Sequence, residues 1–169
     1  MEQQKFDAWY ELESRAGTSW FNNLPKCPTQ LCMVDDKPQN PDPEKWENPQ
    51  EAPGAEKSLH PGAVLSMRSK SFGGHSNQCT YTDWGELIRR STAAGTADFK
   101  SPGQGLAHYE HDVAPIWLAN SLDGGARGNL ISLAISQTPF GPSATISATP
   151  GHNVQRYLEV RPLWAKSEQ

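Results

Sequence analysis

The chain has 169 residues, 36% of them hydrophobic, with 14 glycines and 14 prolines, which predicts a single domain over residues 1–169 with many turns and a modest core. The formal net charge is −4 and the lysines and arginines form no runs, which argues against nucleic acid as a partner. No segment has the roughly 18 apolar residues that span a membrane, and the first residues lack the apolar stretch of a signal peptide, so we expect neither a span nor a leader.

The chain contains three cysteines, Cys27, Cys32 and Cys79. An odd number cannot pair completely within one chain, so we expect at most one internal disulfide and no disulfide-dense scaffold. The sequence leaves open whether any pair forms. The spacing of Cys27 and Cys32 is tolerated in zinc sites, but no second pair of ligands at close spacing accompanies them.

The N-terminal third predicts a helix followed by a polar excursion. Apolar residues follow an imperfect helical stripe through residues 5–16, which ends at Gly17, and Ser19 is placed to cap a short second turn. Residues 28–58 are polar and rich in proline, so we expect an insertion of irregular structure. Trp46 is the exception, and packing against the body of the domain is its favoured role.

Two alternating segments predict a small sheet. Residues 63–69 alternate as a half-buried strand, and residues 77–82 place Cys79 and Tyr81 on one face. The turn at residues 83–85 makes 77–90 a predicted hairpin. Residues 91–105 are small and polar, so we expect a loop there.

The second half predicts one helix and further strands. Residues 106–122 carry the helical pattern, with Pro115 as a predicted break and Asp112 as the cap of the second piece. Beyond it, residues 131–135, 145–149 and 156–161 are the predicted strands. The expected fold is therefore α+β, with two or three short helices around a small, mainly antiparallel sheet and long irregular loops.

Several separate stretches resemble the AMOP domain, in the order in which that family has them. The stretches are residues 20–25 with Cys27-Pro28, residues 60–63 with Arg68-Ser69, residues 78–81, and the later fragments at 87–88, 94–98, 108–113 and 157–162. The resemblance covers about residues 20–163, with insertions at 28–58 and 123–155. Thr29, Ser66 and Thr80 stand at positions where the family pattern has cysteines.

The resemblance implies a disulfide-braced adhesion module of mucin-like and other proteins, in an extracellular or exported location. This chain is disulfide-poor by comparison, so we expect tryptophan packing to replace the missing cross-links. The small number of cysteines and the unremarkable N-terminus instead favour a cytoplasmic location. The compartment stays open at this point.

One dense cluster could carry chemistry: His108, Glu110, His111 and Asp112. On a helix, His108 and His111 would share a face, as ligands of a zinc ion can. Their spacing does not match the metalloprotease motif, and the favoured interpretation is that His108 and Asp112 cap a helix and share a hydrogen bond.

Cys79 is a second chemical candidate, as a nucleophile with His60, His75 or His108 as its base. Its place on an inward strand face favours an inert, buried side chain instead.

Exposed tryptophans are the candidates for recognition: Trp46, Trp84 and Trp164. Trp84 is the most suggestive because it lies at the tip of the predicted hairpin. The alternative is that its ring folds back over Leu87 and Met67.

The favoured function is a non-catalytic protein-interaction or adhesion-type module with a protein partner and no cofactor. The first alternative is a small hydrolase or exported effector that uses the His108–Asp112 cluster, with or without zinc. The second is a structural component of a secretion or appendage assembly. The oligomeric state is open.

Overall fold

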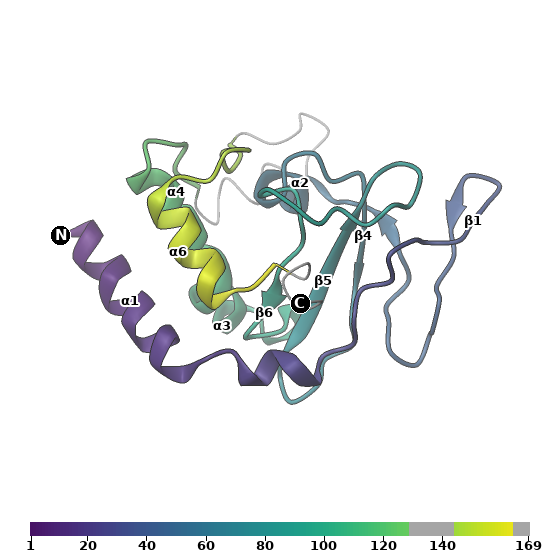
Figure 1. Ribbon diagram of the computed structural model, residues 1–169, viewed down its shortest axis with the longest axis horizontal. Helices are drawn as coiled ribbons and strands as arrows, with labels where there is room; N and C mark the ends of the chain where they lie inside the picture. The colour runs from purple at the N-terminus through teal and green to yellow at the C-terminus, as the bar shows by residue number, and fades with distance from the viewer. Residues whose placement is uncertain (129–143, 164–169) are drawn as a thin grey trace.

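The computed structural model describes residues 1–128 and 144–163 and places most helices on one side of a small antiparallel sheet (Figure 1). The helices are α1 (Glu2–Ala16), α2 (Gly54–Leu59), α3 (Leu106–His108), α4 (Ala114–Leu122) and α6 (His152–Val160), with short 3₁₀ or π turns η1 (Ser19–Asn23), η2 (Pro102–Gln104) and η3 (Tyr109–Val113). The strands are β1 (Met33–Val34), β2 (Lys37–Pro38), β3 (Gln50–Glu51), β4 (Leu65–Arg68), β5 (Ser76–Tyr81) and β6 (Ala97–Asp98). The predicted α+β class is confirmed.

The main sheet has the strand order β3-β4-β5-β6, and all its neighbours are antiparallel. Its centre is the predicted pair of strands, β4 and β5, in the register that places Met67 opposite Cys79. A bridge between Tyr81 and Leu87 closes the predicted hairpin, with Gly85 in the left-handed region at φ +77°. The predicted loop at 91–105 is wrong in part, because β6 pairs with β5 there.

The N-terminal predictions hold with two corrections. Helix α1 ends before Gly17, whose φ is +71°. The residue that precedes η1 is Thr18, with no side-chain cap, so the predicted cap at Ser19 is wrong. The excursion at 28–58 is largely irregular, yet it contributes three short strands and α2, and its tryptophan, Trp46, is buried.

The predicted helix at 106–122 is present without the predicted break. The chain passes from α3 through the π turn η3 into α4, and Pro115 lies in the first turn of α4. Proline has no N–H to donate to the carbonyl of His111, and a local π turn accommodates that loss without ending the helix. Asp112 therefore does not cap a second helix, and that prediction is wrong.

The predicted strands near the C-terminus are also wrong where the structure describes them. Residues 145–149 form no strand, and residues 152–160 form the helix α6 in place of the strand expected at 156–161. Its buried side chains recur at helical spacing: Asn153, Val154, Tyr157 and Leu158. The carboxylate of Asp123, far away in the sequence, accepts hydrogen bonds from the first backbone N–H groups of this helix at 2.9 Å. The strand predicted at 131–135 lies outside the described residues.

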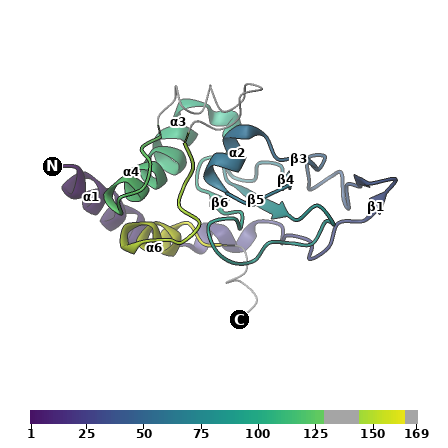
Figure 2. The same cartoon turned by 90° about the horizontal axis from the view of Figure 1, so that it is seen from above.

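Two hydrophobic clusters form the core, one on each side of the molecule. Phe21, Trp46, Met67 and Tyr81 belong to the cluster under the sheet, and Phe6 and Trp117 belong to the cluster among α1, α4 and α6. Seen from above, α2 lies over the sheet, while α1, α4 and α6 form the helical side (Figure 2). No helix within the described ranges has the length and apolar character needed to cross a membrane.

Candidate functional site

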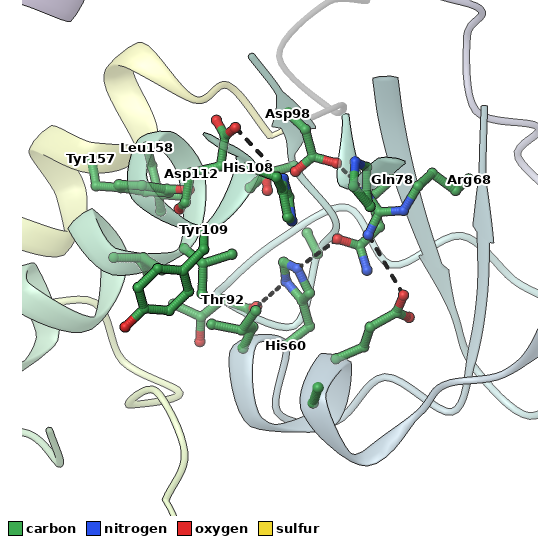
Figure 3. Close-up of a pocket in the computed structure, with 18 residues that line it drawn as sticks. His60, Arg68, Gln78, Thr92, Asp98, His108, Tyr109, Asp112, Tyr157 and Leu158 are labelled. Carbon is green, nitrogen blue, oxygen red and sulfur yellow. Dashed lines mark hydrogen bonds and ion pairs between the residues drawn. The ribbon is translucent and has the colours of Figure 1, made fainter. Parts of the chain in front are cut away.

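A cavity of about 480 Å³ lies where the helical side meets the sheet (Figure 3). Its wall on the sheet side is polar and includes Arg68, Gln78 and Asp98 from β4, β5 and β6. The opposite wall is largely apolar and comes from the helices: Tyr109, Val113, Ile116, Tyr157 and Leu158. The arrangement provides a polar end and an apolar end within one partly open cavity.

His108 and Asp112, from the predicted cluster, both line this cavity. The Nδ1 atom of His108 donates to the carbonyl of Lys100 at 2.6 Å and lies 3.7 Å from the Asp112 carboxylate. Burial disfavours the charged ring, but the carboxylates of Asp112 and Asp98 outweigh it and raise the pKa of His108 above its usual value. The ring is therefore a cationic group of the cavity over a wider pH range than a free histidine.

The carboxylate of Asp112 is fully engaged by its surroundings. It accepts the backbone N–H groups of Phe99 and Lys100 at 3.0 and 2.8 Å, and Arg161 Nε at 2.5 Å. Burial alone would raise the pKa of Asp112, but His108 and Arg161 hold it below its usual value. Asp112 thus ties η3, the chain before α3 and the end of α6 together.

The π turn supplies two further acceptors to α6. The carbonyl of His111 accepts from Arg161 Nη2 at 3.2 Å, and the carbonyl of Asp112 accepts from the Tyr157 hydroxyl at 2.7 Å. These side chains satisfy backbone groups that a regular helix would pair internally. The guanidinium of Arg161 also pairs with Glu13 at 2.8 Å, so α1 is held to the same point.

The sheet side carries an ion-paired group of its own. Arg68 pairs with Asp98, and its Nη2 lies 3.6 Å from the Glu56 carboxylate. Burial raises the pKa of Asp98, whereas the permanently charged guanidinium beside it favours the carboxylate, and we assign the pair as ionised near neutral pH. Ser76 donates to the same carboxylate at 3.1 Å.

His60 closes the cavity beneath this pair. Its Nδ1 lies 3.1 Å from the carbonyl of Thr92, and its Nε2 lies 3.1 Å from Oε1 of the Gln78 side-chain amide (Figure 3). Burial lowers the pKa of His60, so the ring is neutral at physiological pH. The backbone carbonyl of Thr92 can only accept, whereas a side-chain amide can present either end, so we assign the proton of the neutral ring to Nδ1.

The remaining members of the predicted cluster do not join the site. Glu110 is exposed, and His111 lies with Nδ1 3.9 Å from the Glu13 carboxylate, on the side of α1. Within residues 1–128 and 144–163, no group of three or more His, Cys, Asp or Glu side chains is arranged to hold a metal ion. Zinc binding by His108 and His111 stays a prediction for metal analysis.

The cysteine prediction is resolved by a disulfide between Cys27 and Cys79, which are 52 residues apart. Cys79 therefore has no thiol to act as a nucleophile, and the alternative that made it catalytic is wrong. Cys32 is a free, exposed cysteine.

The three tryptophans proposed for recognition have different surroundings. Trp84 is 76% exposed on the turn of the hairpin, so its ring does not fold back into the core. Trp46 is 4% exposed, so the prediction of an exposed Trp46 is wrong and its packing role is confirmed. Trp164 lies outside the described residues.

Arg68, Gln78 and Asp98 were missed by the sequence analysis as members of a site. A signal was present for Arg68 and Gln78, because long polar side chains on strands predicted to pack against the core need partners; Asp98 lies where a loop was predicted. Their partners come from segments distant in the sequence, and only the register of β4, β5 and β6 brings them together.

The family model of the AMOP domain matches residues 1–123 of the chain. This region includes the disulfide, the hairpin with Trp84 and the His108–Asp112 cluster, whereas α6 lies beyond it. No curated protein and no solved structure showed significant similarity to the chain. The matched region is more than half of the chain, and the chain belongs to the AMOP domain family.

Proposed function

We propose that the chain is a non-catalytic, adhesion-type module that binds a protein partner through the hairpin turn carrying Trp84. The observation that carries the proposal is the 76% exposure of this large aromatic ring on an ordered turn. Tryptophan is enriched among the residues that dominate binding energy in protein interfaces. Membership of an adhesion-associated domain family supports the same role.

The turn is held in place by the segment that follows Cys27. Gln30 Nε2 donates to the carbonyl of Trp84 at 2.7 Å, and Leu31 N–H donates to the carbonyl of Gly85 at 2.8 Å. A side chain at Gly85 would approach the Leu31 carbonyl oxygen to 3.1 Å, so glycine permits this contact. A pre-ordered turn loses little conformational entropy when a partner binds.

The proposed location is extracellular or exported. The Cys27–Cys79 disulfide supports it, since disulfides persist in oxidising compartments and are rare in the cytosol. The disulfide also anchors the segment that supports the Trp84 turn.

The hydrolase alternative has weaker support. Among the described residues, no hydroxyl or thiol is hydrogen-bonded to His108, and Nδ1 of this ring is committed to the Lys100 carbonyl. Asp112 is occupied by backbone N–H groups and Arg161. These contacts favour a structural role for the cluster, because a general base needs a proton donor within reach.

The test is a saturation-binding assay of the fluorescently labelled chain on cells and matrix of its native source. The wild type should bind saturably, and Trp84→Ala should weaken binding at least tenfold, as expected for a central interface residue. Phe72→Ala is the matched control, because Phe72 is a second exposed aromatic residue, at 60%. Equal binding by the wild type and Trp84→Ala would refute the role of the turn.

A further inference from the structure

We propose that the cavity between the sheet and the helices is a binding site for a small ligand that carries an ammonium group on an apolar stem. The cavity is separate from the Trp84 turn, so this site is independent of the adhesion-type function. Three features of the cavity support this ligand class: its charge balance, its unpaired polar atoms and its apolar wall.

The charge balance of the described lining is negative. Glu56, Asp98 and Asp112 supply three carboxylates, and Arg68 and His108 are the cationic groups. Even with His108 protonated, the carboxylates outnumber the cations by one. The guanidinium beneath Asp112 is itself paired with a further carboxylate, so it leaves this balance unchanged. Electrostatics therefore favour the binding of a cationic ligand in this cavity over the binding of an anionic one.

Glu56 supplies an acceptor with no partner. Its Oε1 faces Arg68, while its Oε2 is buried and has no hydrogen-bond partner among the described residues. A buried carboxylate oxygen without a donor is costly, and a bound N–H group would remove that cost. The ammonium group of the ligand would donate here.

Gln78 supplies a second acceptor. The residue is 4% exposed, and only one end of its side-chain amide has a partner, which is His60 Nε2. The structure places Gln78 Oε1 beside His60 Nε2 and leaves Gln78 Nε2 unpaired among the described residues. Because the neutral ring of His60 donates from Nδ1 and carries a lone pair on Nε2, we assign the amide with its two ends exchanged, so that its NH₂ group faces the ring. The carbonyl end of Gln78 then remains unpaired, and it too calls for a donor.

The opposite wall of the cavity determines the chemistry of the part of the ligand that carries no charge. Val113, Ile116 and Leu158 present apolar side chains, with the rings of Tyr109 and Tyr157 beside them. The volume of about 480 Å³ lies within the range of small-molecule sites. An aryl or alkyl stem can occupy this wall while its ammonium group reaches the sheet.

The experiment compares three probes of similar shape by NMR titration of the full chain near neutral pH. They are 2-phenylethylamine, the uncharged 2-phenylethanol and the anionic 3-phenylpropionate. The amine should bind in the millimolar range or tighter, with shifts at Ile116 and Leu158, and the carboxylate should bind least. Preferential binding of the carboxylate, or no binding of the amine, would overturn the proposal.

Two variants locate the binding. Glu56→Gln keeps the shape but removes the charge, and it should weaken amine binding about tenfold while alcohol binding stays within about twofold. Glu51→Gln is the matched control, because Glu51 is exposed and lies outside the cavity lining. Ala94→Leu adds volume to the buried lining and should reduce binding of both probes. Unchanged amine binding in Glu56→Gln would overturn the assignment even if Ala94→Leu does not fold.

A last titration distinguishes a free amine from a lysine side chain of a peptide as the ligand. A lysine side chain of a peptide also presents an ammonium on an apolar stem, so Nα-acetyl-lysine methylamide is titrated beside 2-phenylethylamine. Tighter binding of phenylethylamine assigns the site to a free amine, and tighter binding of the lysine derivative assigns it to a lysyl side chain. Trp84→Ala should leave both affinities unchanged, which separates this result from the test of the adhesion role.

Discussion

The Cys27–Cys79 disulfide should supply a large share of the folding stability. The two residues are 52 apart in sequence, and closing a loop of that length in the unfolded chain removes about 14 cal/mol/K of entropy. Reduction should therefore lower the free energy of unfolding by about 4 kcal/mol at 25 °C. For a chain of this size, that change corresponds to a fall of about 8 to 16 °C in Tm.

Urea and thermal unfolding of the oxidised and reduced protein measure this difference. Thiol titration of the unfolded protein should find one free thiol before reduction and three after it, since Cys32 is the free cysteine. Cys32→Ser is the control, and its stability should match that of the wild type because Cys32 is exposed. Oxidised and reduced proteins with equal stability, or three free thiols at the outset, would refute the reasoning.

Three further outcomes follow from the buried polar groups. Arg161→Met leaves the buried Asp112 carboxylate without its guanidinium partner and should lower the free energy of unfolding in urea by about 3–5 kcal/mol. Arg15→Met is the control, and it should change the stability little because Arg15 is exposed. Equal effects of the two substitutions would contradict this. Tyr81→Phe removes a buried hydroxyl that has no partner among the described residues, so unfolding should show stability equal to or up to about 1 kcal/mol above the wild type. Because the pKa of His108 is raised in the folded state, its protonation stabilises the fold below about pH 6.5, and this stabilisation is lost as the pH rises through the folded pKa. The difference in the free energy of unfolding between wild type and His108→Gln should therefore narrow toward alkaline pH. A difference that widens would be inconsistent with this reasoning.

The sequence alone predicted helices and strands correctly where the deciding pattern lies within one short segment. Alternation in residues 63–69 and 77–82 predicted β4 and β5, although the structure buries every residue of β5 and not one face alone. The stripe ending at Gly17 predicted α1.

Predictions failed where distant groups decided the structure. Residues 156–161 alternate enough to suggest a strand, but the cap of α6 comes from Asp123 and its buried face packs against α1 and α4. Pro115 suggested a break, but Tyr157 of α6 and Arg161, the residue after α6, satisfy the carbonyls that the π turn frees. Neither partner is visible within a local window of sequence.

The residues of the candidate site likewise divide into those that the sequence predicted and those that it did not. The cluster at 108–112 was visible because its ligand-type residues are adjacent in sequence. The polar side chains across the cavity, Arg68, Gln78 and Asp98, belong to three strands. The disulfide that excludes a nucleophilic Cys79 was one of several pairings that the sequence left open. Trp84 was found because a hairpin tip is exposed by geometry.

The most direct test of the adhesion role is photo-cross-linking from position 84. A benzophenone amino acid replaces Trp84 in one protein and Phe72 in a second, and each is irradiated on the surface of native cells. The account predicts a discrete protein adduct from position 84 that excess unlabelled wild type abolishes, and little or none from position 72. The same adducts from both positions, or none from position 84, would contradict the account.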